Sequence, residues 1–141
     1  MKNLNRWFAT VAFVGMSAMA PAFSQIQTTL RADVPFDFVV HGKTMPAGEY
    51  TISEAGDRAV VVVRHTGGNE AAAVITIWTS TGKIAEDSKL VFRLGANDHY
   101  FLTKIQTAGY ELGHEVPLTS AQREALASTP VVFASVKAVR Q

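Results

Sequence analysis

The sequence contains no cysteine among its 141 residues. Disulfides and thiolate metal sites are therefore excluded, and no lipid can be attached to an N-terminal thiol. A chain of this length is expected to form one domain, which is large enough to build a stable core. We expect the fold to be held by its hydrophobic core alone.

The sequence also lacks an excess of charge of either sign, with 13 basic and 12 acidic residues. The basic residues are scattered along the chain, and none of its segments reads as a basic patch. Because nucleic-acid binding depends on clustered lysine and arginine, we expect no nucleic-acid partner.

Long hydrophobic runs are missing as well, apart from one uncharged stretch at Trp7–Met19. At ~1.5 Å of rise per residue, this stretch is too short to span a ~30 Å hydrocarbon core comfortably. Lys2 and Arg6 precede it and small residues follow it, which is the layout of a secretory signal peptide. An uncleaved membrane anchor is the alternative.

The sequence thus predicts a signal peptide over residues 1–24 and a single β-rich domain over residues 25–141. Cleavage is expected after Ala22 or Ser24, where small residues fill the required positions. The mature chain would be periplasmic or secreted, with no membrane-spanning segment left after cleavage.

Alternation of apolar and polar residues is the main structural signal in the predicted domain. Val34, Phe36, Phe38 and Val40 fall on one face of an extended chain, because strand side chains alternate. Similar patterns recur between short turn sequences along the chain, and short turns favour antiparallel pairing. The pattern predicts an all-β fold of about eight antiparallel strands, and it leaves a β-sandwich and a small barrel equally open.

One short helix is predicted near the C-terminus. Thr119 is a favourable N-cap, and Gln122 stands at the spacing of a capping box. Leu118 and Leu126 would pack the helix against the sheet, and Pro130 would end it.

The tripeptide Gly42-Lys43-Thr44 resembles the end of a phosphate-binding loop. Such a loop needs a glycine five residues earlier and a helix afterwards, whereas Asp37 occupies the first position and Met45-Pro46 follows. We therefore predict a hairpin here, in which Gly48 adopts a positive φ angle.

Catalytic residues, cofactor-binding residues and metal ligands are not indicated at any position. The four histidines, His41, His65, His99 and His114, are too far apart in sequence to form a recognisable ligand pair. No nucleophile motif occurs. In the sequence Gly113-His114-Glu115 the histidine and the carboxylate should point to opposite faces of a strand.

Aromatic residues are spread over nearly every predicted strand. They can fill a core, which we take as the main prediction, or line an apolar cavity inside a barrel. The set consists of Phe36, Phe38, Tyr50, Trp78, Phe92, Tyr100, Phe101, Tyr110 and Phe133. For Trp78 an exposed binding surface is an equally good interpretation.

Two segments resemble signatures of a known family. They are "VPFDFVVHGKTMPAGEYTI" at residues 34–52 and "KLVFRLGANDHYFLTKIQTAG" at residues 89–109. The segment "GHEVPLTSAQREAL" is similar to the helix entry of the same family. This family comprises small exported proteins of unassigned function, typical of Acidobacteria. The resemblance implies an exported β-rich domain and no catalytic residues.

These observations favour a non-enzymatic binding or interaction module, with no cofactor, whose partner is a protein or a small apolar ligand. A carrier with an apolar pocket inside a barrel is the first alternative, and Phe36, Phe38, Phe92 and Tyr100 would line that pocket. A hydrolase whose residues meet only in three dimensions is the second. It would need two histidines and a carboxylate in one cleft.

Overall fold

The structure is a computed structural model that describes residues 27–141, so the predicted signal peptide lies outside the described residues. Strands form where the alternation is strongest. In β1 (Thr29–Val34) the side chains of Leu30, Ala32 and Val34 are buried while those between them are exposed. Pro35 interrupts the pattern as expected, and β2 (Phe38–Val40) begins after it.

Nine further strands and one α-helix complete the described chain. The remaining elements are β3 (Lys43–Met45), β4 (Gly48–Ala55), β5 (Val60–His65), β6 (Ala71–Ile75), β7 (Ile77–Ser80), β8 (Lys89–Leu94), β9 (Tyr100–Gln106), β10 (Leu112–Glu115), α1 (Ser120–Ala127) and β11 (Val132–Arg140), with a short 3-10 helix at Ala96–Asp98.

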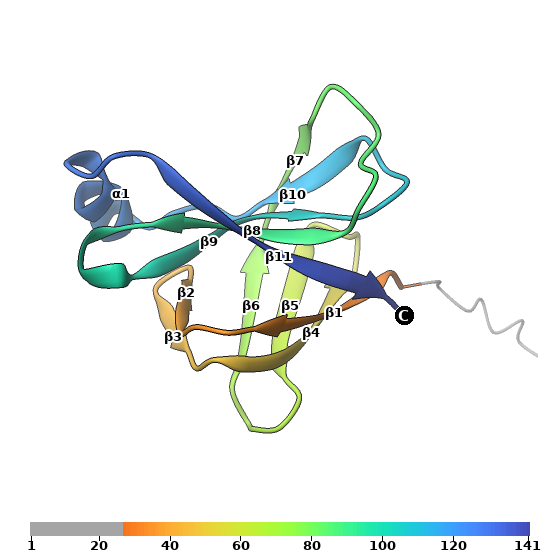
Figure 1. Ribbon diagram of the computed structural model, residues 1–141. Coiled ribbons are helices and arrows are strands. Elements are labelled where there is room, and N and C mark those ends of the chain that lie inside the picture. Colours follow the sequence, from red (N-terminus) through yellow and green to blue (C-terminus); the bar gives the residue numbers. More distant parts are fainter. Residues whose placement is uncertain (1–26) are drawn as a thin grey trace, which may run out of the picture.

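The strands form a nearly closed barrel (Figure 1). Nine of them follow one another in the order β3-β2-β9-β8-β11-β1-β4-β5-β6, and β10 joins β9 to β7 outside this path. All neighbours are antiparallel except β2 and β9. The predicted all-β fold with one helix near the C-terminus is confirmed, and the barrel replaces the sandwich that the sequence left open.

At two places the chain changes its strand partners and bends the sheet into a barrel. β11 pairs with β8 through residues 132–137 and with β1 through residues 138–140. On the opposite side β6 pairs with β5, and after Thr76 the chain continues as β7 and pairs with β10. A strand that changes partners in this way bends the sheet, so Thr76 marks a corner.

Aromatic and branched side chains fill the barrel interior. Phe92 is fully buried, and its ring contacts those of Phe36 and Phe38 at centroid distances of 5.0 and 5.3 Å. Phe36 also stacks on Tyr100 at 3.8 Å. The four aromatics that would line a carrier pocket therefore pack against one another in the core.

The hairpin predicted at Gly42-Lys43-Thr44 is present. Gly42 has φ of +87°, and the chain turns there from β2 into β3. Gly48 has φ of +150°, as predicted. Because Thr44 lies within strand β3, and no helix follows it as a phosphate loop needs, this segment lacks the geometry of a nucleotide site.

The helix α1 begins with the predicted capping box. The Thr119 hydroxyl accepts a hydrogen bond from the Gln122 amide, and the Gln122 side chain accepts one from the Thr119 amide. Leu126 packs the helix down and is buried, whereas Leu118 is only half-buried. Among residues 27–141, no helix is long and apolar enough to cross a membrane.

Replacing Thr119 by alanine should lower the free energy of unfolding by about 1 kcal/mol, because the amide of Gln122 loses its partner. Urea unfolding measures the change. Thr119→Ser keeps the hydroxyl and is the control that should retain most of the stability. Equal losses in the two variants would show that the methyl group, and not the cap, stabilises this helix end.

Candidate functional site

A hollow of about 650 Å³ opens at the end of the barrel where β7 and β10 pair. Its walls come from strands far apart in sequence and from two loops. The lining residues are Thr28, Glu54, Arg58, Trp78, Ile84, Thr107, Gly109, Tyr110, Glu111, Leu112 and His114.

The two loops that wall the hollow are joined to each other by their backbones. The amide of Gly109 donates to the carbonyl of Ala85, and the amide of Ala85 donates to the carbonyl of Tyr110. Gly109 has φ of +86°, which permits the turn that brings these groups together. The Arg140 guanidinium lies 5.7 Å from the centre of the Tyr110 ring, at cation–π distance. The backbone hydrogen bonds between the two loops and the contact with Arg140 therefore hold this wall of the hollow in place.

Large apolar side chains face solvent around this hollow. Trp78 is 40% exposed and Tyr110 is 43% exposed, and Ile84 and Leu112 are also largely exposed. Such a group of exposed apolar residues around one concavity is typical of a contact surface. The sequence left Trp78 open between core and surface. The structure places it at the surface, and Tyr110, which we predicted to be core, lies there too.

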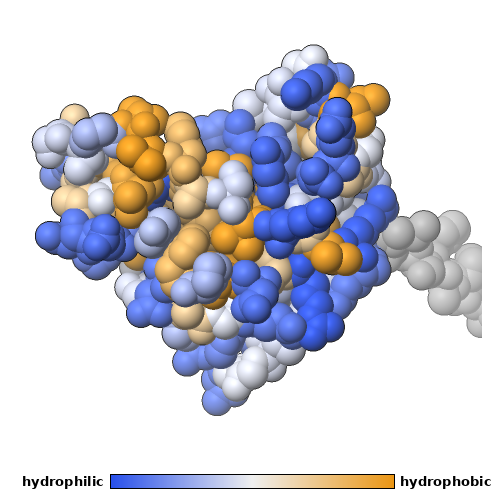
Figure 2. All heavy atoms as spheres, viewed as in Figure 1, coloured by the Kyte–Doolittle hydropathy of each residue, from blue (hydrophilic) through white to orange (hydrophobic). Residues whose placement is uncertain are grey.

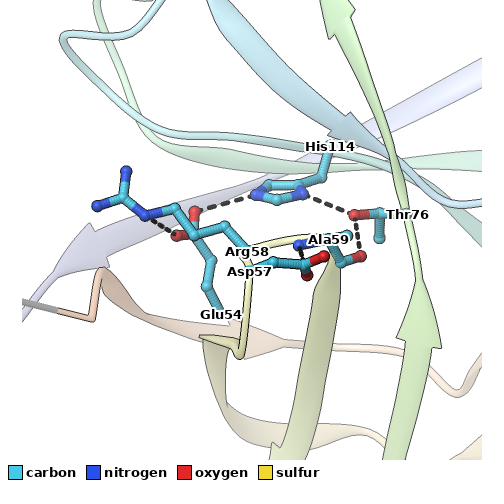
Figure 3. Close-up of polar contacts among 6 residues, drawn as sticks. All are labelled: Glu54, Asp57, Arg58, Ala59, Thr76 and His114. Atoms are coloured by element: carbon cyan, nitrogen blue, oxygen red, sulfur yellow. Dashed lines mark hydrogen bonds and ion pairs between the residues drawn. The ribbon is translucent and has the colours of Figure 1, made fainter. Parts of the chain in front are cut away.

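His114 forms the floor of the hollow and is the most buried of the four histidines. Its Nδ1 lies 2.7 Å from the hydroxyl of Thr76, and its Nε2 lies 3.0 Å from Oε1 of Glu54 (Figure 3). The second carboxylate oxygen of Glu54 lies 3.9 Å from Nε of Arg58. The ring of Trp78 covers the imidazole at a centroid distance of 4.1 Å.

Two proton arrangements satisfy this network. The Thr76 hydroxyl can donate to the carbonyl of Ala59, 2.9 Å away, and accept from His114 Nδ1. It can instead donate to Nδ1, because the amide of Thr76 also donates to the same carbonyl. In both cases the imidazole links the Thr76 hydroxyl to the Glu54 carboxylate, and it thereby ties β10 to the corner at Thr76 and to β4.

The order Thr76–His114–Glu54 has the residue types of a hydroxyl–imidazole–carboxylate triad. A nucleophile, however, must be reachable by a substrate. Thr76 is 5% exposed and is absent from the residues that line the hollow. Its hydroxyl joins β10 to the corner at β6 and β7, which is a structural role.

The other three histidines lie apart from this site. His41 Nδ1 contacts the carbonyl of Pro117, and His99 is exposed beside the short 3-10 helix. His65 lies 3.2 Å from the Glu70 carboxylate and against the ring of Tyr50. Within residues 27–141, no group of three or more His, Asp or Glu side chains is placed to hold a metal ion.

Burial raises the pKa of the Tyr50 hydroxyl to about 12, with smaller contributions from the charges of Glu70 and Asp37. This hydroxyl donates to the carbonyl of Pro46 and holds the turn before β4. Its position in the core hairpin, and not in a cleft, indicates a structural role.

Sequence reasoning missed the His114–Glu54 pair. It correctly expected His114 and Glu115 on opposite faces, since His114 is buried and Glu115 is exposed. Glu54 is separated from His114 by 60 positions, and no local pattern links the two residues. Only the barrel closure brings them together.

Comparisons with protein-family models, with curated proteins and with solved structures find no match to this chain. The resemblance of residues 34–52 and 89–109 to an exported family stays a prediction.

Proposed function

We propose that this protein is a non-enzymatic, exported binding module that holds a small, mostly apolar ligand in the hollow beside His114. The observation that carries the proposal is the hollow itself. Its volume of about 650 Å³ lies within the range of ~300–1,000 Å³ found for ligand sites. Its wall combines exposed apolar side chains with a few polar groups, as such sites do.

The polar groups lie together and would orient one end of the ligand. Glu54, Arg58 and His114 form one connected set on the wall, and Trp78, Tyr110 and Leu112 supply the apolar surface. A ligand with an apolar body and one hydrogen-bonding group matches this division. The ring faces of Trp78 and Tyr110 favour a flat or cyclic body.

Two features support binding over catalysis. The hydroxyl of Thr76 is enclosed by its own hydrogen bonds, and His114 is the sole histidine among the residues lining the hollow. A hydrolase would need a nucleophile or an activated water held against that histidine. The hydrolase alternative therefore has weaker support.

A carrier with its pocket deep inside the barrel also has weaker support. The space beneath the hollow, between Leu30, Ile52, Val61 and Ile105, measures about 10 Å³. That volume holds one water molecule at most. The proposed ligand site therefore lies at the mouth of the barrel.

Native mass spectrometry of protein purified from its own host tests the ligand and the export together. We expect a mass for the protein that corresponds to cleavage after Ala22 or Ser24, and an additional non-covalent mass from a small molecule. The double variant Tyr110→Ala/Leu112→Ala should lose most of the additional mass. The control Ile75→Ala removes a side chain that is 71% exposed and lies outside the hollow, so it should retain the bound mass.

Titration with Nile red, an uncharged apolar dye, gives a second readout. Its fluorescence should rise on binding to the unmodified protein and to Ile75→Ala, and the rise should fall at least fivefold in Tyr110→Ala/Leu112→Ala. Equal dye binding by all three proteins, or the absence of both dye binding and a co-purifying mass, would contradict the proposed site.

A further inference from the structure

A second hollow, of about 680 Å³, lies on the outer face of the barrel between β8, β9, β10, β11 and the start of α1. It shares no residue with the hollow beside His114. Its lining residues are Ile77, Lys89, Val91, Arg93, Thr103, Lys104, Gln106, Glu115, Val116, Pro117, Leu118, Arg123, Phe133 and Ser135.

Strand register gathers four basic residues around this hollow. In β8 the side chains of Leu90 and Phe92 point into the core, so Lys89 and Arg93 lie on the outer face. The neighbouring β9 places Lys104 opposite Val91. Arg123 comes from α1. These cations are scattered over 35 positions of the sequence, and only the fold brings them to one surface.

The positive charge around the hollow is only partly balanced by acidic residues of the described chain. Against four cations the lining contains one carboxylate, that of Glu115, and this carboxylate already accepts a hydrogen bond from Thr79. In the part of the chain that the structure describes, none of these cations lies within 4.0 Å of a carboxylate oxygen. Arg93 is held in place because its guanidinium donates to the carbonyl of Leu126.

The rest of the wall is apolar. Phe133 lies opposite Arg93 in the ladder and is 59% exposed, and Ile77, Pro117 and Leu118 add further apolar surface. Figure 2 shows hydrophobic residues beside hydrophilic ones over α1 and the start of β11. A ligand that fits this hollow needs both a negative charge and an apolar part.

We propose that this outer hollow binds an amphiphilic anion, with a carboxylate or phosphate head group held by Lys104, Arg93 and Arg123 and an alkyl or aromatic body lying against Phe133. Uncompensated cations at close quarters raise the local concentration of anions and favour their binding. The concave shape of the hollow favours a single molecule over the flat surface of a lipid bilayer.

Isothermal titration calorimetry with monomeric decyl phosphate, below its micelle concentration, tests this site. The protein should carry Leu112→Glu, which adds a carboxylate beside Glu54 and Glu111 and keeps anions out of the hollow beside His114. We expect binding that weakens as the salt concentration rises. Inorganic phosphate and decanol, which each lack one half of the probe, should bind at least tenfold more weakly.

Variants identify the site. In the Leu112→Glu protein, Lys104→Gln/Arg123→Gln should weaken decyl phosphate binding at least tenfold, while Lys104→Arg/Arg123→Lys should retain it. Arg64→Gln is a matched control on β5, because Arg64 is an exposed cation outside both hollows and its loss should change nothing. Thermal unfolding of each variant verifies that it is folded.

Several results would overturn the proposal. One is that decyl phosphate does not bind detectably, and another is that the Lys104→Gln/Arg123→Gln variant binds it as tightly as the Leu112→Glu protein does. A third is that decanol binds as tightly as decyl phosphate. A fourth is that the protein binds only to vesicles containing anionic lipid. The last result would identify a membrane surface as the partner instead. Failure here leaves the ligand site beside His114 untouched, because the loss of Nile red binding in Tyr110→Ala/Leu112→Ala tests that site separately.

Discussion

Replacing Phe92 by alanine should lower the free energy of unfolding by about 3–5 kcal/mol, the range for truncating a phenylalanine in a packed core. Phe92 is fully buried, and its ring meets those of Phe36 and Phe38 edge to face. Alanine leaves a cavity among rigid aromatic neighbours, which cannot close it completely. Equilibrium unfolding in urea, followed by circular dichroism, measures the loss.

The size of this loss also distinguishes a filled barrel from a barrel with a ligand cavity. If Phe92 lined an interior pocket, its truncation would enlarge an existing space and cost little. Phe133→Ala is the matched control, because the same atoms are removed from a side chain that is 59% exposed. It should change the stability by less than about 1 kcal/mol. A loss below 1 kcal/mol for Phe92→Ala would favour the carrier alternative.

Replacing Gly48 by valine should destabilise the protein by about 1–3 kcal/mol, because two separate constraints require glycine at this position. The backbone has φ of +150°, which a β-branched residue rarely adopts. A Cβ atom here would also approach Nε2 of His65 more closely than real Cβ atoms come to other atoms. The thermal midpoint and urea unfolding measure the effect.

Two further variants separate backbone strain from the steric clash. Gly48→Ala combined with His65→Ala removes the clash and keeps the strain. After the effect of His65→Ala alone is subtracted, this double variant should lose less free energy of unfolding than Gly48→Ala does. Gly67→Ala is the control, because its Cβ would meet only one atom, at 4.0 Å, and its φ lies outside the positive region. Unchanged stability of Gly48→Val would show that this turn relaxes without cost.

The strands and the helix could largely be predicted because their signals are local. The alternation around Phe36 and Phe38 and the Thr119–Gln122 spacing each depend on a few adjacent residues. Local signals do not show which faces the neighbouring elements will cover, and the prediction was incomplete for this reason. A run of four valines, at residues 60–63, is typical of a strand buried on both faces, yet only Val61 and Val63 are buried, because neighbouring elements cover one side of β5.

For the aromatic residues, too, burial was predicted correctly at some positions and wrongly at others. Phe38 and Phe92 are buried core residues, and Phe36 and Tyr100 are partly buried against that core, as predicted. Tyr110 and Phe133 were assigned to the core too, and each is exposed in a different hollow. Their local patterns are those of strand and turn residues, and the pattern alone does not say which face another element will cover.

By itself, the sequence determined that the chain folds into short antiparallel strands, turns at Gly42 and Gly48, and caps one helix at Thr119, because backbone preference and side-chain alternation act within a few residues. Tertiary structure decided that the sheet curves into a barrel, that Glu54 meets His114, and that Lys89, Arg93, Lys104 and Arg123 surround one hollow. These contacts depend on the register and curvature of strands that lie far apart in sequence, which no local pattern encodes.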